Sequence, residues 1–497
     1  MDASIIDSAR EAVLLTTRRL HITIPSILAV GEHFALRITA FGPDGLPDSG
    51  FDREIVFEES PCVEGLPRSV RFDPAGDGCL VVDGLRATRE GVAYVQTLPE
   101  ASPGRVRSNP AWVHEDPSYR IYWGDLHVHT TFSNCSAWAC KSPEFCYAYA
   151  RDASHLDFAA AADHLRGIAS DPKRWPRLQE LARAHDAPGA FAPFLAFESS
   201  HRRDFGGDNN VYYLGADGPY FWLDREDMAG TGPAVPLQEL WDFLDKTGKE
   251  YLTIPHHTGR AGKYRDFSDG VYDPQREPLF EIYSGWGSSE TQASNYPLRG
   301  GNSDRPCYFD DALRQGCRYG VIASSDTHTT MVGAEAPWRE PLGLLQLAWH
   351  HHHGLAAVRA KELTRASLWQ AMWAGNCYAT TFDRALLDLS IGDVGMGQST
   401  AVGATDPLRR CRMIEGDFYS THHSRAQVTL LRNGEPIDRA SWSADEPTVR
   451  FEDHADLDEV ALRDAPHHPA PFVAYRVRVE GGAGQTQWSS PIWLDLA

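Results

Sequence analysis

Six apolar, strand-like segments in the middle of the chain each run into side chains that are able to bind metal ions. These side chains are His127 and His129, Asp163 and His164, Glu198, His256 and His257, Glu281, and Asp326 with His328. Groups so far apart in sequence can meet only if the strands end on one side of a common sheet or barrel. In a β/α barrel all strand carboxyl ends open on one face, and strand-like and helix-like segments alternate from about Tyr119 onward. The pattern therefore favours a parallel sheet or a barrel.

The spacing of the first two histidines predicts that they act on one ion. His127 and His129 are two residues apart, and side chains at positions i and i+2 of a strand point to the same side. Imidazole nitrogen combined with carboxylate oxygen suits Zn, Mn or Fe, whereas Ca or Mg favours oxygen alone. The segments offer more groups than one such ion uses. We therefore expect more than one ion, with Glu198 or Asp326 as a bridging carboxylate.

The regions on either side of this segment have a different pattern. Residues 21–24 and 34–38 near one end, and 428–431 and 473–479 near the other, read as strands in β-rich surroundings. A chain of 497 residues has room for two or three domains. We expect an N-terminal β-sandwich-like domain over residues 1–118, a metal-binding β/α barrel over 119–384, and a C-terminal β-sandwich-like domain over 385–497.

Two helices can be predicted in detail within the middle region. Apolar residues recur at helical spacing from Leu237 to Leu244, and Gly248 is a plausible end. The second helix has Thr364 as its expected N-cap, an apolar stripe that begins at Leu368, and Gly375 at its end.

Composition narrows the class of partner and the location. The net charge is −21, which disfavours nucleic-acid binding because a phosphate backbone must be met by clustered Lys and Arg. The sequence has no apolar run of membrane-spanning length and no export signal, so we expect neither membrane nor nucleic-acid association. Nine irregularly spaced cysteines fit reduced thiols, and hence a cytoplasmic protein.

The motifs resemble those of the PHP superfamily, named after polymerase and histidinol phosphatase. The stretch 124–130 (GDLHVHT) matches the first motif of that family, and 156–164, which ends in Asp163 and His164, resembles the second. The family has three further motifs, and three segments of this chain resemble them: Phe197-Glu198, 254–259 (IPHHTG) and 324–328 (SSDTH). The likeness extends over about residues 119–382, roughly half the chain, and the layout is similar to a bacterial branch in which this domain sits between two β-rich domains.

The resemblance implies a distorted seven-stranded β/α barrel that binds two or three divalent ions and hydrolyses phosphate esters. Carried over by position, the ligands would be His127, His129, His164, Glu198, His257, Asp326 and His328. Two family positions are filled differently here. Asn134 and Cys135 stand where many relatives have His or Asp, so Cys135 is either a thiolate ligand or a small buried thiol. A second expected His has no clear counterpart, and His201, Asp208, Asn209 or His256 could replace it.

The expected chemistry is hydrolysis by a metal-bridging hydroxide. Asp326 or Asp163 would orient that nucleophile or accept its proton, and His201 or His256 would protonate the leaving group. A small, anionic substrate would be held by basic side chains that follow two of the motif strands, namely Arg202, Arg203, Arg260 and Lys263.

Two other interpretations use the same residues. The first keeps the site but cleaves a C–N, C–O or other non-phosphate bond, because a pair of Lewis-acid ions can polarise many electrophiles. The second is a binding protein whose β-rich domains recognise a glycan or a partner while the metal is structural, in which case protein ligands would saturate the ions. The substrate, the metal and the oligomeric state stay open at this stage.

Overall fold

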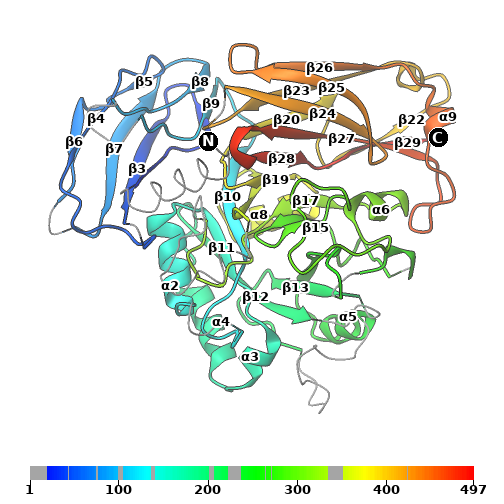
Figure 1. The fold of residues 1–497 in the computed structure, drawn as a ribbon, viewed down its shortest axis with the longest axis horizontal. Helices are drawn as coiled ribbons and strands as arrows, with labels where there is room; N and C mark the ends of the chain where they lie inside the picture. The colour runs from blue at the N-terminus through cyan, green and yellow to red at the C-terminus, as the bar shows by residue number, and fades with distance from the viewer. Residues whose placement is uncertain are drawn as a thin grey trace, which may run out of the picture.

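A computed structural model describes most of the chain and shows that it is built largely of β-strands. The described residues are 19–497 except 43, 74–75, 99–104, 136–139, 201–205, 222–236, 263–264, 270, 334–350 and 423. Strands account for 41% and helices for 15% of the structure. In Figure 1 the N-terminal strands and the C-terminal strands lie side by side above the middle region.

The N-terminal strands surround one apolar core. In β3 (His33–Phe41), alternate residues from Phe34 to Ala40 point into this core, as expected for a sheet with one buried face. The largest of the sheets has the order β1-β3-β7-β5 and is antiparallel throughout. Its other strands are β1 (Arg19–Thr23), β5 (Val63–Glu64) and β7 (Cys79–Ala87). The two smaller sheets contain β2 (Ile27–Ala29), β8 (Gly91–Ala93) and β9 (Ala111–His114), and β4 (Glu54–Val56) and β6 (Ser69–Arg71).

The middle region contributes one end of a 13-stranded sheet, with the order β14-β13-β12-β11-β10-β18-β19. These strands are β10 (Arg120–Val128), β11 (Phe158–Ala161), β12 (Ala192–Ser200), β13 (Asp208–Tyr213), β14 (Tyr251–Pro255), β18 (Gly354–Ala360) and β19 (Cys377–Thr381). A separate small sheet has the order β16-β15-β17 and consists of β15 (Leu279–Ser284), β16 (Gly287–Ser288) and β17 (Gly320–Ala323).

The predicted fold class, a seven-stranded β/α barrel between two β-sandwich-like domains, is wrong. In the part of the 13-stranded sheet that the middle region forms, the β10–β11 and β11–β12 pairs are parallel, whereas β12–β13, β13–β14, β10–β18 and β18–β19 are antiparallel. The gap from Ser200 to Asp208 between β12 and β13 is also too short for a crossover helix, which needs a dozen or more residues. The sheet stays open, since β19 pairs with β28 (Thr486–Ser489) from the far end of the chain.

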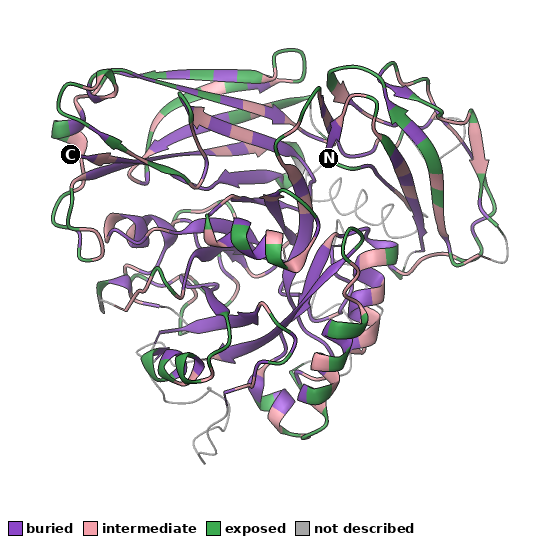
Figure 2. Ribbon diagram, turned by 180° about the vertical axis from the view of Figure 1, so that it is seen from behind, coloured by how far each residue is buried: buried purple, intermediate pink, exposed green. Residues whose placement is uncertain are grey.

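Strand directions were misjudged because buried strands read as continuous apolar segments whichever way their neighbours run. β11, β12 and β14 are buried almost throughout, and Figure 2 shows the same for the strands around them. An apolar segment that ends in a histidine therefore does not reveal the direction of the next strand.

The C-terminal strands extend the same 13-stranded sheet and pack a second sheet against it. Those that belong to the long sheet are β22 (Ser399–Val402), β24 (Arg425–Arg432), β25 (Glu435–Ser443), β27 (Phe472–Gly481), β28 and β29 (Ile492–Leu496). The second sheet has the order β21-β20-β23-β26 and comprises β20 (Leu386–Ile391), β21 (Val394–Gly395), β23 (Arg412–Tyr419) and β26 (Thr448–Asp453). Leu389 of one sheet and Val477 of the other belong to one apolar core.

Helices cover both faces of the sheet in the middle region. In β12, Leu195 and Phe197 share a core with helix α4 (Arg174–Ala184), whereas Phe194 and Ala196 share a core with α8 (Arg365–Trp373). The other helical segments are α2 (Pro143–Ala148), η2 (Tyr149–Ala153), α3 (Leu165–Ala169), α5 (Leu237–Lys246), η5 (Phe267–Asp269), α6 (Phe309–Arg314), η6 (Pro407–Arg409), α9 (Leu457–Val460) and η7 (Gly482–Gly484). Within the described ranges, no helix is long and apolar enough to cross a membrane.

Both helices predicted in detail are confirmed. α5 begins at Leu237, and Gly248 just beyond its end has a positive φ of 64°. α8 is capped by Thr364, whose side chain accepts a hydrogen bond from Ser367 N, and Gly375 past its end has φ 65°. Apolar periodicity and the glycine at each end, with a capping residue for α8, sufficed to predict these two elements.

Candidate metal centre

The end of β10 and the segment after β17 run side by side and place four candidate ligands together. Asp326 N donates to His127 O at 2.8 Å and His129 N to Thr327 O at 3.0 Å, and Val128 bridges Thr327 in parallel. Because alternate residues of adjacent parallel strands face the same way, His127 and His129 meet Asp326 and His328. This local pairing makes the H-x-H and D-x-H motifs parts of one site.

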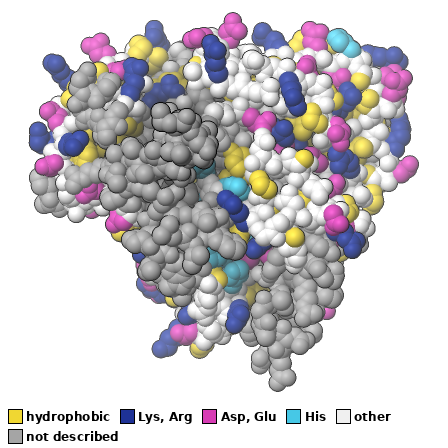
Figure 3. Space-filling view, viewed as in Figure 1, with side chains coloured by type: hydrophobic (Ala, Val, Ile, Leu, Met, Phe, Trp, Pro, Cys, Tyr) yellow, Lys and Arg dark blue, Asp and Glu magenta, His cyan; other side chains and the backbone are white. Residues whose placement is uncertain are grey.

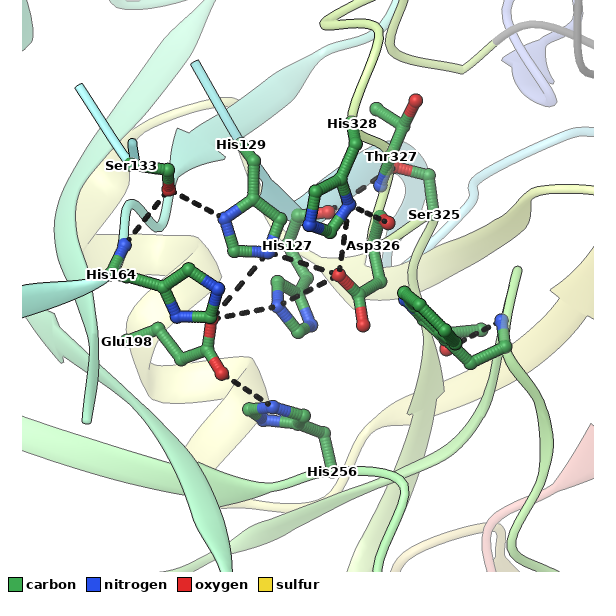
Figure 4. Close-up of polar contacts among 12 residues, drawn as sticks. His127, His129, Ser133, His164, Glu198, His256, Ser325, Asp326, Thr327 and His328 are labelled. Atoms are coloured by element: carbon green, nitrogen blue, oxygen red, sulfur yellow. Dashed lines mark hydrogen bonds and ion pairs between the residues drawn. The ribbon is translucent and has the colours of Figure 1, made fainter. Parts of the chain in front are cut away.

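Asp326 lies at the centre of a group of histidines. Its Oδ1 is 3.0 Å from His129 Nε2 and 3.5 Å from His127 Nε2. Its Oδ2 is 3.5 Å from His257 Nδ1. One carboxylate therefore faces imidazoles from two separate parts of the chain, the position expected of a bridging ligand (Figure 4).

Glu198, near the end of β12, occupies a comparable place. Its Oε2 is 2.6 Å from His164 Nδ1 and 3.5 Å from His129 Nε2, and its Oε1 is 3.3 Å from His256 Nε2. His164 and Glu198 are neighbours in a parallel bridge, so the β11 and β12 ends bring them together. Figure 4 shows the histidines gathered around Glu198 and Asp326.

Within the part of the chain that the structure describes, three groups of side chains have ligand atoms within 4.8 Å of one another. The first is His129, Cys135, His164 and His328; the second is His127, His129 and Glu198; the third is Asp208, His256 and His257. Every predicted metal ligand belongs to one of these groups or, in the case of Asp326, contacts members of two of them. Cys135, Asp208 and His256, which the sequence left as alternatives for the unfilled family positions, are all within the cluster.

Further side chains hold these ligands in orientation. His127 Nδ1 lies 3.1 Å from Glu281 Oε2, which leaves Nε2 facing the cluster. Ser133 Oγ lies 2.8 Å from His129 Nδ1 and accepts a hydrogen bond from His164 N at 2.9 Å. Such partners fix the ring orientation of a ligating histidine. Sequence reasoning missed Ser133, because a loop serine carries no signal of this role.

Asp125 and Asp163 accept hydrogen bonds from backbone N–H groups around the site. Asp125 Oδ1 accepts from His127 N at 3.2 Å and from Ser325 N at 3.0 Å, which ties β10 to the segment carrying Asp326. Both carboxylate oxygens of Asp163 bind Thr130, at 2.6 Å to its N and 2.7 Å to its Oγ1. Asp163, a predicted catalytic residue, thus holds the turn after β10 and is in none of the three ligand groups.

Backbone strain occurs at two of the candidate ligands. His257 has φ 31° and Asp326 has φ 50°, in or near a left-handed region that residues other than glycine seldom adopt. Strain of this kind costs about 1 to 3 kcal/mol for a residue and concentrates at functional sites. The sequence gives no sign of it.

The histidines and carboxylates of the cluster shift one another's pKa values. Burial opposes protonation of His127, but the nearby Asp326 and Glu281 carboxylates outweigh it and hold the pKa of His127 well above its usual range. Burial likewise opposes ionisation of Asp326, yet His127 and His129 keep the pKa of this carboxyl well below its usual range. For Glu198 the histidines, His164 foremost, overcome burial and lower the pKa in the same way. The buried carboxylates thus favour positive charge at this place.

The donor set fits divalent ions. Among the described residues, the buried nitrogens His127 Nε2 and His256 Nδ1 have no hydrogen-bond partner, although buried polar groups normally have one. Imidazoles and carboxylates in one cluster match the preferences of Zn, Mn or Fe. Two or three ions at these positions would satisfy the nitrogens and the carboxylate charge together.

Comparisons with other proteins add relatives but no family. No protein-family profile matches the chain. It is 25% identical over 423 residues to an uncharacterized protein of Chlamydia pneumoniae, with 84% of this chain and 64% of that protein covered. It is 27% identical over 433 residues to one of Chlamydia trachomatis serovar D, with the same coverage. The chain therefore spans less than two thirds of the length of these relatives.

Solved structures resemble the chain only weakly. Dimeric latent PorU from Porphyromonas gingivalis has a TM-score of 0.15 and 9% identity, over 97% of this chain and 34% of that one. Trypsin-activated alpha-2-macroglobulin from Escherichia coli has a TM-score of 0.17 and 9% identity, over 96% and 23%. Likenesses at this level bear on neither fold nor function.

Of the predicted substrate-binding residues, Arg260 lies beside the cluster. Its guanidinium carbon is 4.3 Å from the centre of the Trp286 ring, and that ring is 6.0 Å from His328. Burial and the charge of Arg260 both act to lower the pKa of His257, but Asp208 and Asp326 outweigh them and raise it above its usual value. His201, Arg202, Arg203 and Lys263 lie outside the described residues. Figure 3 shows histidines reaching the surface beside Lys or Arg side chains on one face.

Proposed function

We propose that the protein is a metal-dependent hydrolase, foremost a phosphoesterase. The observation that supports this proposal is the convergence of three ligand groups around two carboxylates, Glu198 and Asp326, each of which contacts histidines from several segments. A structural metal is usually enclosed by four protein ligands, whereas a shared carboxylate between neighbouring ions is typical of hydrolytic centres. The similarity to the PHP motifs agrees with this choice.

Two or three ions bound here would supply Lewis acidity and an activated water. The chain's own residues would hold and orient them: Glu198 and Asp326 between positions, and Glu281 and Ser133 on the far nitrogens of His127 and His129. Asp326 would accept or orient the proton of the attacking water. With its Nδ1 left without an ion, His256, whose pKa burial and the neighbouring His257 lower, would be the described candidate for exchanging a proton with the leaving group.

Arg260 supports an anionic substrate. Its guanidinium is stacked on Trp286 and so preorganised, and it lies on the His328 side of the cluster. A guanidinium recognises phosphate with paired hydrogen bonds. This arrangement favours phosphate esters over neutral amides or esters, which the same ions could also polarise.

A substrate panel tests the proposal. Phosphomonoesters and phosphodiesters, together with carboxylic esters and amides, would be incubated with the purified full chain before and after treatment with a chelator. We expect turnover of at least one phosphoester class, its loss with chelator and its return with added Zn or Mn. Turnover confined to amides or carboxylic esters would replace the phosphoesterase assignment, and an inert panel with metal bound would contradict hydrolysis.

We also propose a reducing, cytoplasmic setting and a small-molecule substrate. The nine cysteines all lie within the described residues and form no disulfide there, and most are buried, which fits a compartment where thiols stay reduced. The strongly negative net charge of −21 argues against a nucleic-acid substrate.

A further inference from the structure

The cysteine after β10 is held toward two histidines of the cluster. Its neighbour Asn134 has φ 59°, a conformation that Asn tolerates better than most residues. Asn134 Nδ2 donates to Ser170 Oγ at 3.0 Å, and Arg174 Nη1 donates to Asn134 Oδ1 at 2.9 Å. These bonds anchor the loop to α3 and α4. Cys135 then contacts both His164 and His328.

This group differs in chemistry from the other two. Cys135, His129, His164 and His328 offer one sulfur and three nitrogens within 4.8 Å of one another. The other groups offer only imidazole nitrogen and carboxylate oxygen. Thiolate and imidazole are both ligand types that zinc uses, and one Cys with three His would fill its four positions, whereas Mn and Mg favour oxygen-rich surroundings.

His129 cannot serve two ions at once. Its Nδ1 is occupied by Ser133 Oγ at 2.8 Å, so only Nε2 is left, and Nε2 also lies 3.0 Å from Asp326 Oδ1. If His129 binds with His127 and Glu198, the first group retains Cys135, His164 and His328. The thiolate is then one of three protein ligands of that ion, and its loss would weaken the binding of the ion.

We propose that Cys135 is a metal ligand, and that with His164 and His328 it forms a position selective for thiolate-binding ions such as Zn²⁺ or Co²⁺. The centre would thus be heterogeneous, with one sulfur-containing position beside two nitrogen and oxygen positions. The inference rests on the proposed metal centre, but not on turnover of any substrate.

Cobalt substitution of the whole 497-residue chain tests this directly. Bound Co²⁺ should give a near-ultraviolet thiolate-to-cobalt charge-transfer band in the wild type. The band should be lost in Cys135→Ser and kept in Cys411→Ser, a matched control since Cys411 is the other exposed cysteine and lies in the C-terminal region. Zinc retention against a competing chelator should fall at least about tenfold at one position in Cys135→Ser alone, because even partners of ligands matter by about that much.

The outcomes separate this inference from the proposed function. A cobalt-loaded wild type without the band, or a band that persists in Cys135→Ser protein, would overturn the thiolate position. A band that behaves as expected in protein without phosphoesterase activity would support the position while the proposed function fails. Circular dichroism and the cobalt content of the remaining positions would confirm that Cys135→Ser protein is folded.

Discussion

Replacing Asp326 with Asn probes the centre at its most connected residue. The substitution preserves the size of the side chain, and Asn is among the residues that adopt the left-handed conformation seen at φ 50° most readily. What it removes is a negative charge that lies 3.0 to 3.5 Å from the nitrogens of His127, His129 and His257. The fold should therefore survive, whereas the electrostatics of the site should not.

The size of the effect follows from Coulomb's law. Unit charges about 4 Å apart interact by about 4 kcal/mol at an effective dielectric constant of about 20. The amide oxygen can still coordinate, so part of this is retained, and we expect a net loss of at least about 2.7 kcal/mol, or a hundredfold. Metal affinity and turnover should both fall by at least about that factor.

The assay combines metal analysis, turnover and circular dichroism for Asp326→Asn and a control. Asp464→Asn is matched, since Asp464 also has a left-handed backbone, with φ 54°, but is exposed in the C-terminal region. The control should keep wild-type metal content and activity. If Asp326→Asn retains both its metal and its turnover, the assignment of Asp326 to the centre is refuted.

Three further predictions concern protons, substrate and stability. Metal affinity should fall steadily from about pH 8 to pH 5, because the raised pKa values of His127 and His164 mean that protons compete with the ions; competition titrations showing no pH dependence would contradict this. Arg260→Met should raise KM for a phosphoester at least about tenfold, as expected for losing a charge-assisted hydrogen bond, and steady-state kinetics with an unchanged KM would exclude Arg260 from substrate binding. Arg265→Met should lower the free energy of unfolding by about 3 to 5 kcal/mol, because the fully buried Glu277 would lose its ion-pair partner. Glu277 Oε1 lies 2.6 Å from Arg265 Nη1. Urea denaturation measures this loss, and a value below about 1 kcal/mol would argue against it.

The candidate site was more predictable from sequence than the fold around it. The i, i+2 spacing of His127 and His129 follows from strand geometry, and it predicted their common orientation. Asp326 and His328 share this spacing, and the structure places them against the same strand end. The relative orientation of side chains in such short motifs depends only on local strand geometry, so it can be predicted without knowing the sheet topology.

The sheet topology could not be read in this way. The β19–β28 pairing joins Tyr378 to Ser489, and such a contact leaves no trace in either segment alone. The antiparallel pairing of β13 with β12 goes with a short connection between Ser200 and Asp208, and the apolar pattern of the strands does not reveal this direction. The orienting contacts of Ser133 and the strained φ of His257 likewise arise from tertiary packing.

Metal stoichiometry tests the central claim most directly. The whole 497-residue chain, purified without added metal and never exposed to chelator, would be assayed by elemental analysis, and its protein concentration would be measured in the same samples. Mixed nitrogen and oxygen ligands hold such ions strongly, so we predict about two or three equivalents of Zn, Mn or Fe per chain, as three adjoining ligand groups imply. A total below about one equivalent would contradict the claim that this cluster is a multinuclear metal centre.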